Sequence, residues 1–281
     1  SAHVANCRRK QPIGTQQLAH AVLGVPLGKG SFISPDRFIE RNSNARFRTD
    51  LSKPLVHRES ELADLIESIE QNRAVVIQGR SGSGKTKIAL DACLSFSEKH
   101  RWDFLILDSR YSANLDEDIE LILSESENVI ILADDANGNL SLEHLLGVCS
   151  ENGKLKIVFT CRKMYWSELA ARINACLRYK EIELAPLAAE NIDTILETEY
   201  DIKNRALRGR IATIAKGNLR IAIMAATSIA DGDFEAIREP YDLLKIYMDS
   251  ALASYSIREK RIAEILAIYD YCDLVEDDPC Y

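Results

Sequence analysis

The chain has 281 residues, of which 46% are hydrophobic and 28% charged, and its formal net charge is −8. These values are typical of a folded protein of about two domains, and they exclude long disorder, collagen-like repeats and coiled coils. The acidic balance argues against a protein whose whole surface binds nucleic acid. A local basic patch stays open, and Arg8 to Lys10 form the clearest basic run, although such a run is usually a solvated tail.

The seven cysteines are scattered and form no CxxC pair, so they indicate reduced thiols rather than disulfides or a zinc site. The best apolar stretch, Ile221 to Ala230, is too short to cross a bilayer. The start of the chain, Ser1 to Val4, lacks the pattern of a secretion signal. We therefore expect a cytoplasmic protein that does not act on a membrane.

The first fifty residues contain many of the glycines and prolines that signal turns, and we expect a connector or extension there. Residues Gly28 to Ser31 (GKGS) resemble a phosphate-binding loop superficially. No strand pattern precedes them and their spacing is wrong, so we interpret them as a turn.

Strand and helix patterns then alternate. Short apolar runs predict five buried strands, at Ala74–Gln78, Phe104–Asp108, Val129–Ala133, Lys156–Thr160 and Glu181–Leu184. Helical spacing is found from Leu62 to Ile69 and at Lys85–His100, Leu115–Leu123, Leu140–Cys149 and Trp166–Leu177. This alternation predicts an α/β fold with a parallel sheet, helices on both faces, and a ligand site beyond the carboxyl ends of the strands.

After Pro186 the strand pattern stops and only helical patterns follow. They lie at Glu190–Thr198, Asn204–Lys216, Leu219–Ala230, Tyr241–Tyr255 and Ile257–Tyr271. A mainly helical second domain is therefore expected after the sheet.

The strongest motif follows the first predicted strand. Residues Gly79 to Thr86 (GRSGSGKT) match GxxxxGK[ST] at every fixed position. The glycines let backbone N–H groups face a polyphosphate, Lys85 supplies charge for the β- and γ-phosphates, and the Thr86 hydroxyl ligates Mg²⁺. The predicted nucleotide ligands here are Gly79, Ser81, Gly82, Ser83, Gly84, Lys85, Thr86 and Lys87.

Two strand ends offer the acidic group that a P-loop enzyme needs for its metal ion. Asp134 and Asp135 end the most apolar strand as a pair, whereas Asp108 ends another strand alone. We favour the pair, with Asp134 binding Mg²⁺ and Asp135 orienting the attacking water. Asp108 is then a helix cap or a surface acid; the alternative for the pair is a solvated turn.

The strand at Lys156–Thr160 leads into Cys161 and Arg162. If it lies between the P-loop strand and the acidic strand, Thr160 and Arg162 emerge beside the γ-phosphate. Arg162 would then distinguish a triphosphate from a diphosphate. The alternative is that Arg162 is a surface residue near Lys163.

In their order, these motifs resemble the STAND class of P-loop ATPases, which includes NB-ARC and NACHT proteins, and especially its prokaryotic members. Leu55 to Leu62 (LVHRESEL) resembles the hhGRExxL motif of that class, with His57 in place of the usual glycine. The Leu-Ala-Asp-Asp and Thr-Cys-Arg runs resemble its acidic and sensor motifs. Leu184 to Leu187 resembles the turn into the helical lid, and Gly217 to Arg220 the GxP motif of the lid, with leucine in place of proline.

The resemblance implies that Arg58 and Pro186 contact the nucleotide and that Arg220 reaches the phosphates as a second sensor. It implies ATP or ADP and Mg²⁺ as cofactors, homo-oligomerisation on activation, and an effector or sensor partner in prokaryotic antiviral defence or signalling. The four expected regions are an extension or linker (1–50), a P-loop domain (51–187), a helical lid (188–238) and a helical segment that begins a winged-helix domain (239–281). The chain would then be a fragment of a larger protein.

We interpret the chain as a regulatory switch that binds ATP and hydrolyses it slowly. The alternative is an AAA+-like ATPase that acts on nucleic acid or protein, although such machines usually have Asp-Glu rather than Asp-Asp in the acidic motif. A third reading is a scaffold that holds nucleotide as a structural cofactor. A small kinase is disfavoured because the sequence contains no separate acceptor-site motif.

Overall fold

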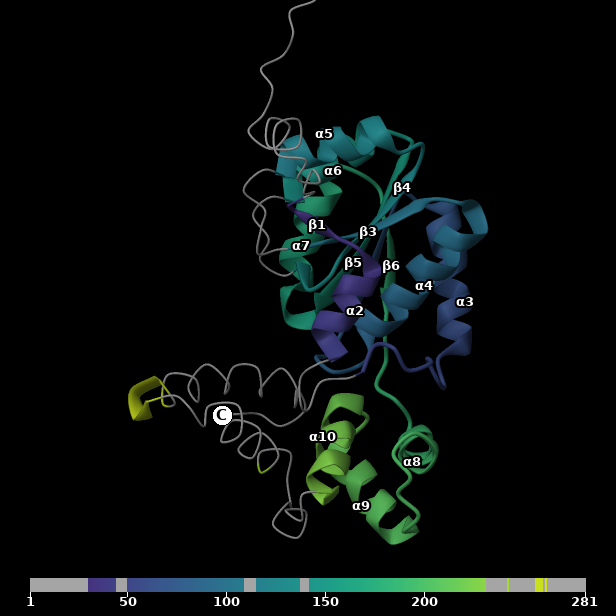
Figure 1. The fold of residues 1–281 in the computed structure, drawn as a ribbon, viewed down its shortest axis with the longest axis vertical. Helices are drawn as coiled ribbons and strands as arrows, with labels where there is room; N and C mark the ends of the chain where they lie inside the picture. Colours follow the sequence, from purple (N-terminus) through teal and green to yellow (C-terminus); the bar gives the residue numbers. More distant parts are fainter. Residues whose placement is uncertain are drawn as a thin grey trace, which may run out of the picture.

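The computed structural model describes residues 30–43, 50–108, 115–136, 142–230, 242, 256–259 and 261. Within these ranges a sheet domain is followed by a smaller group of helices (Figure 1). The basic run from Arg8 to Lys10 and most of the helices expected after Tyr241 lie outside the described residues, and with them the expected winged-helix segment.

The sheet has six strands in the order β1-β3-β4-β5-β2-β6. They are β1 (Phe32–Ile33), β2 (Ala74–Gly79), β3 (Asp103–Leu107), β4 (Val129–Ala133), β5 (Leu155–Arg162) and β6 (Lys180–Glu183). Strands β2 to β6 pair in parallel, and β1 pairs antiparallel with β3. The predicted parallel sheet is confirmed. Strand β5 lies between the P-loop strand β2 and the acidic strand β4. This is the strand order in which Thr160 and Arg162 are expected to emerge beside the γ-phosphate.

The helices of the sheet domain alternate with its strands. They are α2 (Pro35–Ser43), α3 (Glu59–Gln71), α4 (Lys85–His100), α5 (Leu115–Glu125), α6 (Leu142–Glu151) and α7 (Trp166–Asn174), with a short 3₁₀ helix η3 (Lys163–Tyr165) before α7. None of the helices in the described part of the chain is long and apolar enough to cross a membrane.

Two apolar layers hold the sheet between its helices. Successive strand residues point to opposite faces, so β2 contributes Val76 to one layer and Val75 and Ile77 to the other. Helices α3 and α4 cover the Val75 face, and α5, α6 and α7 cover the opposite face (Figure 1). The near-continuous apolar strands of the sequence reflect this burial on both faces.

The segment before residue 50 corrects two expectations. Residues 32–43 form β1 and α2 and belong to the sheet domain rather than to a connector. Arg41 of α2 pairs with Asp108, which follows β3, with Nη1 and Oδ2 2.5 Å apart. The Asp108 side chain is only 5% exposed. Asp108 is therefore an acid in an ion pair, not a surface acid.

The second group of helices consists of α8 (Ala189–Thr198), α9 (Arg205–Ala215) and α10 (Leu219–Ala230), and we call it the lid. The three helices share an apolar cluster of their own, separate from the two layers of the sheet. Val56, which precedes α3 in the sheet domain, packs against this cluster. Residues Leu184 to Ala188 therefore link the two units covalently. The units are also in contact where Val56 packs against the lid.

Candidate nucleotide-binding site

The turn between β2 and α4 is shaped as an anion site. Gly82 and Gly84 have φ angles of 75° and 94°, in the left-handed region that favours glycine. Helix α4 begins at Lys85, and the N–H groups of its first turn have no partner inside the helix. These donors and the positive end of the helix face the space in front of the turn, as phosphate binding requires.

Two buried polar groups of this turn fit a polyphosphate. The Lys85 ammonium donates to the carbonyl oxygens of Gly79 at 2.8 Å and of Arg80 at 2.6 Å. The Ser83 hydroxyl is buried and has no hydrogen-bond partner among the described residues. Buried polar atoms are nearly always hydrogen-bonded, so this hydroxyl indicates a ligand with acceptor oxygens.

Asp134 lies at the carboxyl end of β4, directly beside the P-loop helix. Its Oδ1 accepts hydrogen bonds from the Thr86 hydroxyl at 2.8 Å and the Thr160 hydroxyl at 2.7 Å. Burial raises the pKa of Asp134, and the two hydroxyl hydrogen bonds oppose that shift. A carboxylate and a hydroxyl at this spacing are oxygen ligands of the kind that Mg²⁺ takes beside a nucleotide.

Asp135 and Arg162 meet next to this pair. Asp135 has a left-handed φ of 51°, and its backbone N–H donates to the Thr160 hydroxyl at 2.8 Å. Arg162 Nε lies 3.4 Å from Asp135 Oδ1. Lys163 turns away from them and pairs with Glu183. Arg162 thus faces the site, whereas the alternative of a surface residue grouped with Lys163 finds no support.

The sequence predicts only that Thr160 lies beside the γ-phosphate. The fold gives it two contacts, because its hydroxyl donates to Asp134 and accepts from the Asp135 backbone. It is 1% exposed, near the carboxyl end of β5 and directly after the apolar residues Ile157 to Phe159. A hydroxyl at the end of a buried strand was the available signal, but its partners depend on the strand order.

The lid contacts the P-loop directly through Asn218. Its Nδ2 donates to the Ser81 carbonyl at 2.8 Å, and its Oδ1 accepts from the Ile221 N–H at 3.2 Å at the start of α10. A Cβ atom on Gly82 would lie 2.3 Å from Asn218 Oδ1 and 2.9 Å from Arg220 Cβ. Only a glycine leaves room for this approach, so the lid is seated on the phosphate loop.

Changing Asn218 to Asp should loosen the lid without unfolding it. The aspartate keeps the oxygen that caps α10, but it loses the donor to Ser81 and brings a negative charge to that carbonyl. We expect amide hydrogen exchange at Ser81 to Ser83 to rise by about tenfold. Asn204→Asp is the matched control, because Asn204 caps α9 in the same way at a distance from the P-loop. Equal exchange in the two variants would contradict a role of the Asn218 contact with Ser81 in holding the lid on the P-loop.

Arg58 links the P-loop to the turn into the lid. Its guanidinium donates to the Ala185 carbonyl at 2.5 Å, to the Ser83 carbonyl at 3.5 Å and to the Glu61 carboxylate at 2.7 Å. Pro186 packs against Gly217 and lies outside the main cavity. The Lys87 ammonium bonds the Leu51 carbonyl and the Asp91 carboxylate. Donors of Arg58 and Lys87 are thus already used within the protein.

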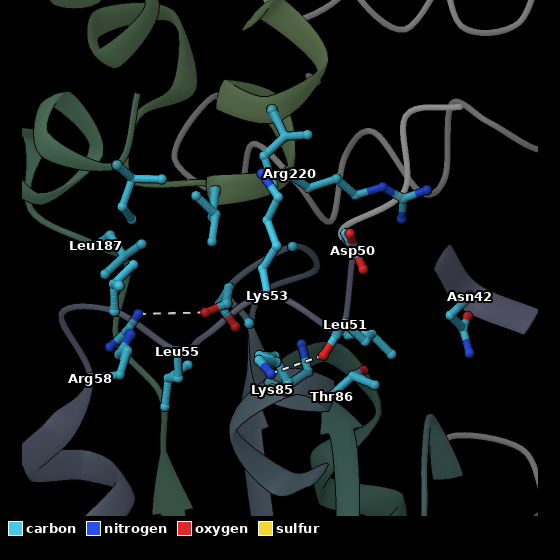
Figure 2. A pocket seen from close by; sticks show the side chains of 18 of the residues that line it. Asn42, Asp50, Leu51, Lys53, Leu55, Arg58, Lys85, Thr86, Leu187 and Arg220 are labelled. Carbon is cyan, nitrogen blue, oxygen red and sulfur yellow. Dashed lines mark hydrogen bonds between the residues drawn. The ribbon is translucent and has the colours of Figure 1, made fainter. Parts of the chain in front are cut away.

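A cavity of about 390 Å³ lies between the two units (Figure 2). This volume falls in the range of small-molecule sites, which is roughly 300 to 1,000 Å³. The cavity has both polar and apolar lining. The polar lining includes the P-loop residues, Asp134, Asp135, Thr160, Arg162 and Arg220. The apolar lining includes Val56, Leu187, Ile195 and Leu219, which belong to or pack against the apolar cluster of the lid, and Ile223.

The strand order, the glycine-rich turn and the neighbouring acidic strand end together define a P-loop NTPase fold. Residues 50–174 match the family model described as Novel STAND NTPase 5. This part of the chain is therefore similar to the P-loop NTPase domains of the STAND class, in agreement with the motifs. The family implies nucleotide binding, usually with Mg²⁺. No curated protein sequence matches the chain.

Solved structures share the fold at low sequence identity. The ORC1 protein of Aeropyrum pernix, in complex with DNA, has a TM-score of 0.56 at 16% identity over 74% of this chain and 71% of that chain. Hsp104 of S. cerevisiae, in complex with casein, has a TM-score of 0.52 at 16% identity over 82% and 46%. The RuvB branch migration motor of Thermotoga maritima has a TM-score of 0.48 at 18% identity over 62% and 60%. The chain thus spans less than two thirds of the RuvB chain, and the likeness concerns the fold alone.

Proposed function

We propose that this chain is a nucleotide-dependent switch, in which ATP or ADP with Mg²⁺ in the cavity sets the position of the lid on the sheet domain. The observation that carries the proposal is the Asn218 contact with Ser81, because it joins the lid to the loop that would hold the phosphates. A ligand shifts such an equilibrium only if it contacts the two positions differently. A ligand in this cavity would touch both units.

In this proposal residues 79–86 of the P-loop and Arg220 bind the phosphates, whereas the Lys87 ammonium keeps its protein partners. Lys85 would exchange its carbonyl partners for β- and γ-phosphate oxygens, and Ser83 would gain the acceptor that it lacks. Arg58 acts through the loop, because it holds Ser83 and Ala185 together. Pro186 would contribute to the turn rather than touch the ligand.

The acidic pair supports slow hydrolysis. Thr86 and Asp134 would hold Mg²⁺, which supplies charge neutralisation at the β- and γ-phosphates when it is bound. Asp135 would orient a water molecule and accept its proton, and Arg162 would detect the γ-phosphate. The distance of 3.4 Å between Arg162 Nε and Asp135 Oδ1 supports a role in which the arginine affects both the phosphate and the proposed base.

We further propose that the P-loop domain comprises residues 51–187 and the lid domain residues 188–238. Strand β1 and helix α2 would add to the P-loop domain. Nucleotide state would control homo-oligomerisation and an effector or sensor partner. The scattered cysteines support a cytoplasmic setting, and the family resemblance supports a role in prokaryotic defence or signalling. Hydrolysis would reset the switch rather than drive continuous work.

The experiment is mass spectrometry of nucleotide released when the purified chain is denatured. A locked switch should retain ADP through purification, and exchange of that ADP for ATP should change the molecular mass in light scattering. An empty site, together with strong stimulation of hydrolysis by DNA and salt-sensitive DNA binding, would instead favour an AAA+-like ATPase acting on nucleic acid.

A further inference from the structure

A second contact between the lid and the sheet domain lies at the cavity, formed by Lys53. The Lys53 ammonium donates to the Glu199 carbonyl at 3.1 Å and lies 4.5 Å from the centre of the Tyr200 ring. All three residues line the cavity. Figure 2 shows Lys53 extending from the segment before α3 toward the lid helices. The contact therefore spans the two units.

The ring of Tyr200 is suited to hold this cation. It is partly buried against the apolar cluster of the lid. Burial, with the negative charges of Asp50 and Glu199, raises the pKa of Tyr200 to about 12, so the phenol is neutral at physiological pH. A cation over a partly desolvated tyrosine ring contributes stabilisation that an exposed lysine lacks.

The Asn218 and Lys53 contacts between the units lie at different places. Asn218 binds Ser81 at the P-loop, whereas Lys53 binds residues that follow α8. Val56, three positions after Lys53, and Ile195, four before Glu199, are part of the apolar lining, and Tyr200 packs against the same apolar cluster of the lid. Apolar walls of this kind accommodate the flat face of a nucleobase. The Lys53 contact therefore adjoins the apolar lining, where a base would pack, and we call this part of the cavity the base end.

We propose that Lys53 and Tyr200 form a clasp that retains bound nucleotide by closing the base end of the cavity. The inference rests on the proposed nucleotide-binding function. Lys53 is a positioning residue, because it holds the lid rather than the phosphates. A ligand with a base must part the clasp to leave, whereas a ligand that fills only the phosphate end need not. The clasp should therefore govern the dissociation rate of nucleotides and not that of inorganic tripolyphosphate.

The test measures dissociation of a fluorescent ADP analogue, chased by excess ADP in a stopped-flow instrument. Lys53→Met keeps most of the aliphatic stem and removes the charge, and Tyr200→Leu removes the ring. Each should raise the dissociation rate by about tenfold, and the double variant should add little further, because both changes break one contact. Lys53→Arg and Tyr200→Phe keep the cation and the ring, so they should stay near the parent rate.

Two measurements separate the clasp from general weakening. The affinity for tripolyphosphate, obtained by competition, should be the same in Lys53→Met as in the parent. Lys163→Met is the control for loss of a lysine, because Lys163 is half exposed and lies outside the cavity. An unchanged dissociation rate in Lys53→Met, or an equal loss of tripolyphosphate affinity, would overturn the clasp. Nucleotide binding that survives removal of Lys85 would instead count against the proposed function itself.

Discussion

Replacing Lys85 with alanine should lower the affinity for ATP and ADP by at least about a hundredfold, because charge-assisted hydrogen bonds to phosphate are among the strongest in proteins. Lys85 is 8% exposed, and its ammonium already lies within the P-loop, 2.8 Å from the Gly79 carbonyl. Little rearrangement is needed for it to meet a phosphate. Isothermal titration calorimetry with ADP and Mg²⁺ measures the loss directly.

The matched control is Lys87→Ala, two residues along the same helix. Lys87 has the same charge and also lines the cavity, but its ammonium is engaged by the Leu51 carbonyl and the Asp91 carboxylate. We expect its affinity to stay within about threefold of the parent, since the ammonium is already held by protein partners. Unchanged ATP affinity in Lys85→Ala would remove the P-loop from the function of this protein.

The features that the sequence predicted well depend on residues close together in the chain. Strand β2, the turn at Gly79 to Thr86 and helix α4 follow one another directly, so apolar runs and one contiguous motif specify all three. The hhGRExxL resemblance also concerns a local feature: His57 stands where the motif usually has glycine, and it has a left-handed φ of 57°. The backbone at this position therefore has a conformation that glycine adopts most readily, although the residue is histidine.

The features that the sequence could not predict depend on contacts between distant segments. Strand β1 has two residues, and its pairing with β3 leaves no periodic pattern. Asn218 and Ser81 are 137 positions apart, and the link between Arg58 and Ala185 spans 127. A polar side chain near a turn can also form hydrogen bonds with nearby backbone groups. Its distant partner can therefore be identified only when the sheet order and the lid position are known.

Changing Asp135 to Asn should lower ATP turnover by about a hundredfold while nucleotide affinity stays nearly unchanged, because a positioned general base contributes on the order of 10² to 10⁴ in rate. Asparagine has nearly the same shape as aspartate but cannot take a proton from water. The Asp135 backbone is fixed by Thr160, so the substitution should leave the turn in place. A multiple-turnover assay of phosphate release, run beside ADP titrations, separates the two effects.

The control for this change is Asp108→Asn, which alters the other acid at a strand end. Asp108 is bound to Arg41 and does not line the cavity, so turnover should stay at the parent level even if the variant is less stable. Equal turnover in the parent and in Asp135→Asn would remove Asp135 from catalysis. With ADP still bound, that result would favour nucleotide as a structural cofactor. A fall confined to Asp135→Asn would instead place the proton-accepting group at the end of β4, where Thr160 connects it to the metal-binding Asp134 proposed above.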